Sequence, residues 1–382
     1  MKGREGTKFR DLPPDLRPMF HGARILVAPL DWGLGHAARC VPIVQQLLEL
    51  GAVPVIGADK GPSALLHEEF PELDFVQIPG MEVRYSRNGS QAWAMARQLP
   101  AMLRQVRQEH AWLQANLDRL QLDAVISDQR FGLYAPALPS VLVTHQVFPF
   151  TPLGQGTARR INRKHIQRFD RCWIADHAEA PGLAGELSHG MDLPQNAHYI
   201  GPLSRFAGTP PHSNQQPIHV AAVISGPEPQ RSLLEAQVLQ QLQAIEGPHL
   251  LVTGKPGTEV RHAGQVRIEG HLPTEALRNA LARAELIVGR TGYSTLMDLA
   301  AIGRGALLIP TPGQPEQEYL GRLHGHGGRH VVQAQRQLDL ATALKDPPER
   351  HAPCKTSGAL SVAMNDLAGL IMRPRNHILP SP

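Results

Sequence analysis

Residues 24–50, RILVAPLDWGLGHAARCVPIVQQLLEL, contain three patterns in succession. The run 24–30 is apolar, which is typical of a buried strand. Residues 31–36 form a Gly-rich turn, and apolar side chains then return at helical spacing until Gly51, a residue type common just after a helix C-terminus. This strand–turn–helix unit predicts an α/β protein with parallel strands.

The same alternation continues through both halves of the chain. Further strands are expected at 53–58, 75–78, 123–127, 141–144, 171–175, 198–200, 218–225, 249–253, 266–269, 286–288 and 306–309. Further helices are expected at 91–120 with a break at Pro100, and at 230–245, 274–283, 295–302, 317–324 and 357–371. The sequence thus predicts two Rossmann-like, doubly wound domains facing each other across a cleft. In such folds ligands lie outside the carboxyl ends of the strands.

Composition shifts give the expected domain boundaries. A polar, Pro-rich mobile tail covers 1–21, the N-terminal domain 22–203, a Pro- and Gly-rich linker 204–217, the C-terminal domain 218–372 and a second tail 373–382.

Overall composition excludes several classes of protein. Hydrophobic residues make up 42% of the 382 residues, enough for a sizeable core. The net charge of +4 is too small for a nucleic-acid binder, although it suits an anionic substrate or an anionic membrane surface. Three scattered cysteines exclude a disulfide scaffold and a cysteine zinc site, and they predict a cytoplasmic protein. No apolar run approaches the ~18 residues of a membrane-spanning helix.

The Gly-rich turn is the first candidate site. Gly33 and Gly35 let the backbone approach a ligand where a helix begins. Ala38 stands where a dinucleotide fingerprint has its third glycine, which disfavours a nicotinamide cofactor. His36 would face the cleft as a candidate general base, with a purely structural histidine as the alternative.

Two later turns are candidate anion sites, because each follows a strand and begins a helix. Residues 225–231 offer free amides and a guanidinium, although a plain turn with a solvated Arg231 fits as well. Residues 289–295 place small and hydroxyl side chains at a helix start.

Sugar-binding groups are expected beside these turns. Asp298 could accept sugar hydroxyls or cap the helix dipole. The stiff loop 310–319 presents Gln314, Glu316, Gln317 and Glu318 together, and such side chains suit sugar hydroxyls.

The run from Arg159 to Arg168 is strongly basic. It fits either a solvated helix face or a surface that docks on anionic lipid headgroups.

Three of these segments together resemble a known family. GLGH at 33–36, GRTGYSTLMDLAAIG at 289–303 and IPTPGQPEQEYL at 309–320 are similar to GT-B glycosyltransferases of family 28, which includes the peptidoglycan lipid-linked N-acetylglucosaminyltransferases. The resemblance implies an acceptor-binding N-terminal domain, a C-terminal domain that binds a UDP-sugar, and inverting transfer. It also implies that no cofactor and no bound metal are needed.

The resemblance assigns roles to individual positions. It implies donor contacts by Gly226, Gln230 and Arg231 near the diphosphate, Leu272 at the uracil, Gly292, Ser294 and Thr295 at the α-phosphate, Asp298 at the ribose, and Gln317 and Glu318 at the donor sugar. It implies acceptor-side loops at Gly33, Gly35 and Gln146. The Pro-rich GPEPQ at 226–230 and the acidic Glu318 depart from the family pattern and leave the sugar and the acceptor open.

The predicted function is transfer of a hexose or N-acetylhexosamine from a UDP-sugar to a hydroxyl. His36 is the expected base, with His145 and Asp128 as alternatives. A lipid-linked acceptor is one candidate, and it would place the protein at the inner face of the membrane. A UDP-sugar epimerase of the same fold and a non-catalytic nucleotide-sugar-binding protein are the competing hypotheses.

Overall fold

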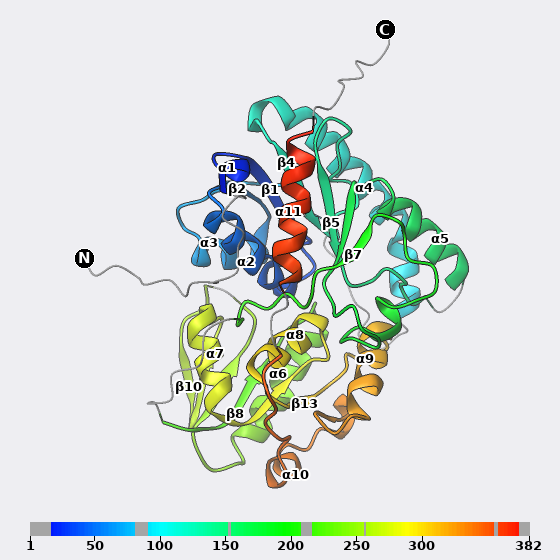
Figure 1. The fold of residues 1–382 in the computed structure, drawn as a ribbon. Coiled ribbons are helices and arrows are strands. Elements are labelled where there is room, and N and C mark those ends of the chain that lie inside the picture. Colours follow the sequence, from blue (N-terminus) through cyan, green and yellow to red (C-terminus); the bar gives the residue numbers. More distant parts are fainter. Residues whose placement is uncertain are drawn as a thin grey trace, which may run out of the picture.

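The computed structural model describes residues 17–80, 91–151, 154–207, 216–255, 257–354 and 358–373. These residues form two seven-stranded sheets, one from each half of the chain, with helices packed around them (Figure 1).

The N-terminal sheet has the order β3-β2-β1-β4-β5-β6-β7, and its strands are all parallel. Its strands are β1 (Arg24–Pro29), β2 (Val53–Gly57), β3 (Asp74–Val76), β4 (Ala124–Asp128), β5 (Ser140–Thr144), β6 (Arg171–Ile174) and β7 (Ala197–Tyr199). The helices of this half are α1 (Arg17–Phe20), α2 (Leu34–Glu49), α3 (Lys60–Glu69), α4 (Gln91–Leu120), α5 (Gln155–Ile166) and the 3₁₀ helix η1 (Gly185–Leu187).

The C-terminal sheet has the order β10-β11-β9-β8-β12-β13-β14, and β10 alone of its strands pairs antiparallel. Its strands are β8 (Ile218–Val223), β9 (His249–Val252), β10 (Arg261–Ala263), β11 (Val266–Glu269), β12 (Ala284–Gly289), β13 (Leu307–Leu308) and β14 (Val331–Val332). Its helices are α6 (Gln230–Leu242), α7 (Thr274–Arg283), α8 (Tyr293–Ile302), α9 (Pro315–Gly325), the 3₁₀ helix η2 (Gln335–Gln337), α10 (Leu340–Lys345) and α11 (Ala359–Ile371).

The predicted fold class, two doubly wound domains, is confirmed. The expected break at Pro100 is wrong, because α4 continues through it. A proline removes one helical hydrogen bond, and the flanking turns can continue past that loss. The central strands β4 and β5 are buried along their whole length, as expected of parallel strands covered on both faces.

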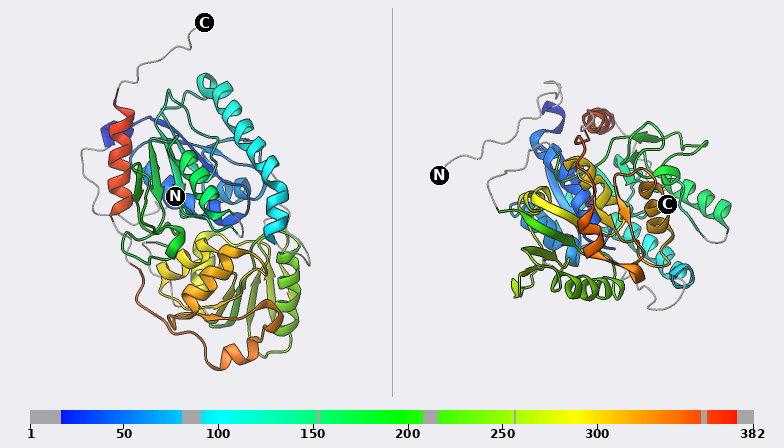
Figure 2. Two further views of the ribbon diagram at one scale, coloured as in Figure 1. Left: turned by 90° about the vertical axis from the view of Figure 1, so that its right-hand side faces the viewer. Right: turned by 90° about the horizontal axis from the view of Figure 1, so that it is seen from below.

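The last helix, α11, lies against the N-terminal half, although it follows the C-terminal sheet in the chain (Figures 1 and 2). Asp366 accepts two hydrogen bonds from the Arg171 guanidinium at the start of β6, and Gln46 of α2 donates to Ser361 at 2.9 Å. The expected C-terminal domain, 218–372, therefore contains a helix that packs with the other half. The apolar face of α11 packs against the N-terminal half. The order of the elements along the chain does not reveal this contact.

The ends of the chain also differ from the expectation. The predicted mobile tail, 1–21, includes α1, and the apolar ring of Phe20 in this helix is fully buried in the core. Residues 1–16 and 374–382 lie outside the described residues, and so does most of the predicted linker, 208–215.

Parallel pairing brings the carboxyl ends of the central strands together. Pro29 at the end of β1 pairs with Asp128 at the end of β4, and Asp128 pairs with Val143 of β5. The turns that follow β1 and β5, and the last residue of β4, therefore lie at one edge of the N-terminal sheet. This edge faces the corresponding edge of the C-terminal sheet.

Candidate active site

A cavity of 1160 Å³ lies between the two halves. It is lined by turns that follow strands in both sheets and by α5 at one side. The turns of the N-terminal half include residues 32–36, 145–146 and 149–151. Those of the C-terminal half include residues 223–227, 287–289, 292–295 and 314–317. The predicted location of the site, outside the carboxyl ends of the strands, agrees with this geometry.

His36 lies in the first turn of α2, where Gly33 precedes the helix with φ 146°, a backbone angle that favours glycine. Its ring Nδ1 is 2.8 Å from Oδ2 of the fully buried Asp128. The imidazole remains 18% exposed, toward the cavity. A carboxylate on one ring nitrogen and a cavity beside the ring is the arrangement expected of a general base.

Arg39 follows one helical turn later and has a 2% exposed side chain. Its Nε donates to Oδ1 of Asp128 at 2.8 Å, and its two terminal nitrogens lie 2.8 Å from Nδ1 of His36 and 3.0 Å from Nδ1 of His145. One guanidinium thus connects all three predicted catalytic residues.

The charges of this group support a neutral base beside an ionised carboxylate. Burial lowers the pKa of His36, and Arg39 lowers it further, against the opposing effect of Asp128. Burial alone would raise the pKa of Asp128, but Arg39 and His36 together hold it below its ordinary value. At neutral pH the imidazole is therefore ready to accept a proton.

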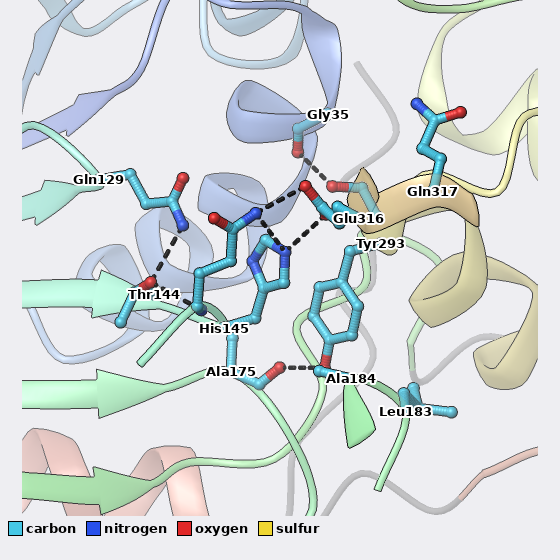
Figure 3. Close-up of polar contacts among 12 residues, drawn as sticks. Gly35, Gln129, Thr144, His145, Ala175, Leu183, Ala184, Tyr293, Glu316 and Gln317 are labelled. Atoms are coloured by element: carbon cyan, nitrogen blue, oxygen red, sulfur yellow. Dashed lines mark hydrogen bonds and ion pairs between the residues drawn. The ribbon is translucent and has the colours of Figure 1, made fainter. Parts of the chain in front are cut away.

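A second set of contacts crosses the cavity (Figure 3). Nε2 of His145 lies 2.9 Å from Oε1 of Glu316 at the start of α9, and Gln146 donates to the other oxygen of Glu316 at 2.6 Å. The ring of Tyr293 stacks on His145 with centroids 4.1 Å apart, and its hydroxyl donates to the carbonyl of Ala175. Burial would raise the pKa of Glu316, but the hydrogen bond from His145 holds it below its ordinary value.

The two Gly-containing turns meet in the same region. The hydroxyl of Ser294 donates to the carbonyl of Gly35 at 2.9 Å, so the N-termini of α2 and α8 lie next to each other. A Cβ atom at Gly35 would come 2.9 Å from the Ser294 hydroxyl, so this close approach needs glycine. Both helices begin at a glycine without a side-chain cap, which leaves backbone amides directed at the cavity.

Asp298 of α8 lies on the C-terminal side of the cavity. Its Oδ1 accepts from the hydroxyl of Ser204 at 2.6 Å, and its Oδ2 is 4.0 Å from Nε of Arg205. Burial raises the pKa of Asp298 to about 6, although Arg205 and Ser204 oppose the rise. Two buried guanidinium nitrogens of the 7% exposed Arg205, one of them the Nε that faces Asp298, have no hydrogen-bond partner, and Arg205 also lines the cavity. This cation beside the cavity is in contact with Asp298 and with the ring of Phe206.

Of the residues predicted to bind the donor, six line the cavity: Gly226, Gly292, Ser294, Thr295, Asp298 and Gln317. The predicted acceptor-side residues Gly33, Gly35 and Gln146 line it too. The structure brings these residues together, and their assigned roles stay predictions.

Four predicted donor contacts lie elsewhere. Arg231 pairs with Glu228 of its own turn and donates to the carbonyl of Thr253, so its charge is used locally. Glu318 accepts from the amide of Gly313 at 2.7 Å and closes the turn before α9. Gln230 is buried at the start of α6, and Leu272 lines a separate cavity of 570 Å³ beside α7.

Sequence reasoning did not assign Arg39, Arg205 or Tyr293 to the site. Arg39 had a usable signal, because a residue three positions after His36 shares its helix face. Glu316 was expected, with three other side chains of the loop 310–319, to suit sugar hydroxyls, and its contact with His145 was not predicted. Arg205 and Tyr293 carried no pattern that separates them from ordinary loop and core residues.

The basic run from Arg159 to Arg168 is largely helical, as α5. Arg160 and Lys164 are exposed, and the apolar side chain of Ile161 between them is 48% exposed. In the part of the chain that the structure describes, no helix is both long and apolar enough to cross a membrane. Within that part there is also no group of three or more His, Cys, Asp or Glu side chains placed to hold a metal ion.

Known proteins match both the sequence and the fold. Residues 271–341 match the glycosyltransferase family 28 C-terminal domain. The UDP-N-acetylglucosamine–N-acetylmuramyl-(pentapeptide) pyrophosphoryl-undecaprenol N-acetylglucosamine transferase of Syntrophotalea carbinolica is 25% identical over 89% of this chain and 94% of that enzyme. The enzyme of the same name from Klebsiella pneumoniae is 27% identical over 76% of this chain and 78% of its own length. That of Rhodopseudomonas palustris is 35% identical, over 25% of this chain and 29% of the relative.

Solved glycosyltransferases share the fold at low identity. The glycosyltransferase SnogD from Streptomyces nogalater has a TM-score of 0.57 at 15% identity, covering 92% of this chain and 95% of that chain. The glycotransferase of kitacinnamycin has a TM-score of 0.58 at 14% identity, with the same coverage. These structures share the GT-B arrangement of two facing Rossmann-like domains.

Proposed function

We propose that this chain, a glycosyltransferase of the GT-B fold that resembles the family-28 enzymes, transfers a hexose or N-acetylhexosamine from a UDP-sugar to a hydroxyl acceptor. The transfer would invert the anomeric centre and need no bound metal. The observation that carries the proposal is the His36–Asp128 pair, 2.8 Å apart, directed at a cavity whose opposite wall is the family-28 segment.

In this mechanism Nε2 of His36 takes the proton of the acceptor hydroxyl. The acceptor oxygen forms a bond to the anomeric carbon while the bond to the diphosphate breaks, and the electron pair leaves with UDP. Attack from the face opposite the leaving group inverts the anomeric centre. Asp128 stabilises the imidazolium that forms, and Arg39 limits its build-up before substrate binds.

The leaving diphosphate gains negative charge as this bond breaks. Backbone amides at the start of α8 and the guanidinium of Arg205 lie on the cavity wall where this charge would develop. These fixed positive groups make charge stabilisation by the protein alone feasible, which supports a metal-independent reaction.

A lipid-linked acceptor belongs to the same proposal. The relatives from Syntrophotalea and Klebsiella carry a pyrophosphoryl-undecaprenol acceptor in their names. Helix α5 lines one side of the cavity and exposes Arg160, Ile161 and Lys164 beside it. An anionic membrane surface would bind this helix by charge and bring a lipid-linked hydroxyl to the cavity.

The first test is thermal stabilisation of the protein by UDP, GDP, ADP, TDP and by UDP-glucose, UDP-galactose and UDP-N-acetylglucosamine. At 100 times its dissociation constant a ligand adds ~2.7 kcal/mol. Stabilisation by UDP and one UDP-sugar supports the donor class. Stabilisation by TDP alone, or by no nucleotide, contradicts it.

Product analysis separates the remaining possibilities. Incubation with the donor alone tests for an epimerised sugar, and incubation with candidate acceptors tests for transfer. The anomeric configuration of the product tests inversion, and retained turnover in excess EDTA tests metal independence. Donor binding with no turnover on any acceptor would favour a non-catalytic binding protein.

A further inference from the structure

The guanidinium of Arg39 touches both histidines of the cavity. One terminal nitrogen lies 3.0 Å from Nδ1 of His145, the other 2.8 Å from Nδ1 of His36, and Nε donates to Asp128. Arg39 is nearly inaccessible to solvent, so these contacts are not exchanged for water. We propose that Arg39 is a positioning residue that fixes the tautomer of His145, while Asp128 fixes the opposite tautomer of His36, so that His36 is free to act as the base and His145 is committed to the loop that carries Glu316.

The tautomer of His145 follows from the donors around it. A guanidinium stays protonated and has only N–H donors, so Nδ1 of His145 accepts and carries no proton. The ring proton then sits on Nε2, which donates to Oε1 of Glu316 at 2.9 Å. With both ring nitrogens in use, His145 has no lone pair left for a substrate proton.

The tautomer of His36 is the reverse. Nδ1 lies 2.8 Å from Oδ2 of the buried Asp128, and an unprotonated Nδ1 would leave two lone pairs facing each other and that oxygen without its donor. The terminal nitrogen of Arg39 that lies 2.8 Å from Nδ1 does not need this ring nitrogen as its acceptor, because the same terminal nitrogen lies 2.5 Å from Oδ1 of Asp128. His36 therefore holds its proton on Nδ1 and keeps the lone pair on Nε2.

The contacts that fix the two tautomers connect the two sides of the cavity. Arg39 and Asp128 orient the base on the N-terminal side. Through His145 the same guanidinium supports the contact to Glu316, the second residue of α9. The inference rests on the proposed function, because it names the atom of His36 that takes the substrate proton.

The pH dependence of His36 gives a readout that a merely structural arginine would not move. The charged and titratable groups that face His36 are Arg39 on its own helix, Asp128 at the end of β4, His145 after β5 and Glu316 on α9. Arg39 lowers the pKa of His36, and Asp128 raises it. Without the guanidinium the pKa of His36 should rise.

The experiment is ring-nitrogen NMR of the unmodified protein labelled with ¹⁵N-histidine, with His36→Asn and His145→Asn used to assign the two signals. We expect protonated Nδ1 for His36 and protonated Nε2 for His145. The same tautomer at both residues would overturn the inference. This measurement needs no substrate and no variant of Arg39.

Variants of Arg39 provide the second arm. Arg39→Gln should raise the titration midpoint of His36 and leave His145 with mixed tautomers. Arg39→Lys keeps the positive charge but not the forked guanidinium. It should therefore leave the titration midpoint of His36 near its original value, while His145 loses its fixed tautomer. Unchanged spectra in both variants would overturn the inference.

Arg304→Lys is the matched control. Arg304 is also buried and bonded to several carbonyls, but these lie in the C-terminal half, away from both histidines. It should lower stability without changing either histidine signal. Failure of UDP binding would count against the proposed function and leave the tautomers as measured, so the two failures are distinguishable.

Discussion

Replacing His36 by alanine tests the central step of the proposed mechanism. The side chain contacts Asp128 and Arg39, both in the N-terminal half. The cavity-lining turns that would hold the nucleotide, 225–227 and 289–295, belong to the other half. His36→Ala should therefore lower turnover without a comparable loss of UDP affinity.

The size of the effect follows from the role. A positioned general base contributes ~10²–10⁴-fold, equivalent to about 3–5 kcal/mol of activation free energy at 1.36 kcal/mol per tenfold. The cost to folding is smaller. In the variant, Asp128 loses the hydrogen bond to His36 but keeps the one from Arg39. We therefore expect the unfolding free energy to fall by about 1–3 kcal/mol.

The assay measures kcat at saturating donor and UDP affinity by calorimetry in the same preparation. Because burial and Arg39 lower the pKa of His36 from 6.5, the activity of the unmodified enzyme should fall on the acid side below pH 6.5. The variant should lose this limb of the profile. His198→Ala, at an exposed position on β7, is the control. Unchanged kcat in His36→Ala, or an acid limb that persists in it, would remove His36 from the mechanism.

Three further predictions concern neighbouring features. The folded pKa of Asp298, about 6, exceeds its unfolded value of 3.8, so the stability that this carboxyl provides is present below pH 4 and is lost as the pH rises through 6. The loss amounts to about 3 kcal/mol of unfolding free energy at most. Asp298→Asn should remove this pH dependence, which urea unfolding at pH 4 and pH 7 measures. Gly35→Ala places Cβ against the Ser294 hydroxyl and should cost about 1–3 kcal/mol of unfolding free energy, with recovery when Ser294→Gly is added; no recovery would contradict the contact. Arg160→Glu with Lys164→Glu should weaken binding to anionic vesicles by about 30-fold, from about 1 kcal/mol per lost basic residue, and equal binding by both proteins would exclude α5 as the docking surface.

The sequence was sufficient to place His36, Asp128 and His145 near one another. Each was predicted in a turn or at a strand end, and parallel strands bring their carboxyl ends to one edge. The register confirms this, because Asp128 pairs with Pro29 of β1 and Val143 of β5. Periodicity and turn composition are local properties of the chain, so they were enough for this inference.

The sequence did not show which polar groups are available to a ligand. Arg231 and Glu318 are charged residues in turns where a ligand contact was expected. Arg231 instead pairs with Glu228, and Glu318 accepts from the Gly313 amide, each within its own turn. Arg205 was not singled out, and two of its buried nitrogens beside the cavity have no hydrogen-bond partner. Short-range hydrogen bonds compete with ligand binding, and only atomic positions decide the outcome.

The sequence by itself determined the two α/β halves, the turns that face the cavity and the histidine that begins α2. Their hydrophobic periods and glycines specify local structure whatever the rest of the chain does. Tertiary structure alone decided that His145 meets Glu316, 171 residues away, and that α11 returns to the N-terminal half. Such contacts depend on how the surfaces of the two halves pack against each other. A local sequence pattern does not indicate which residues of the two surfaces will meet.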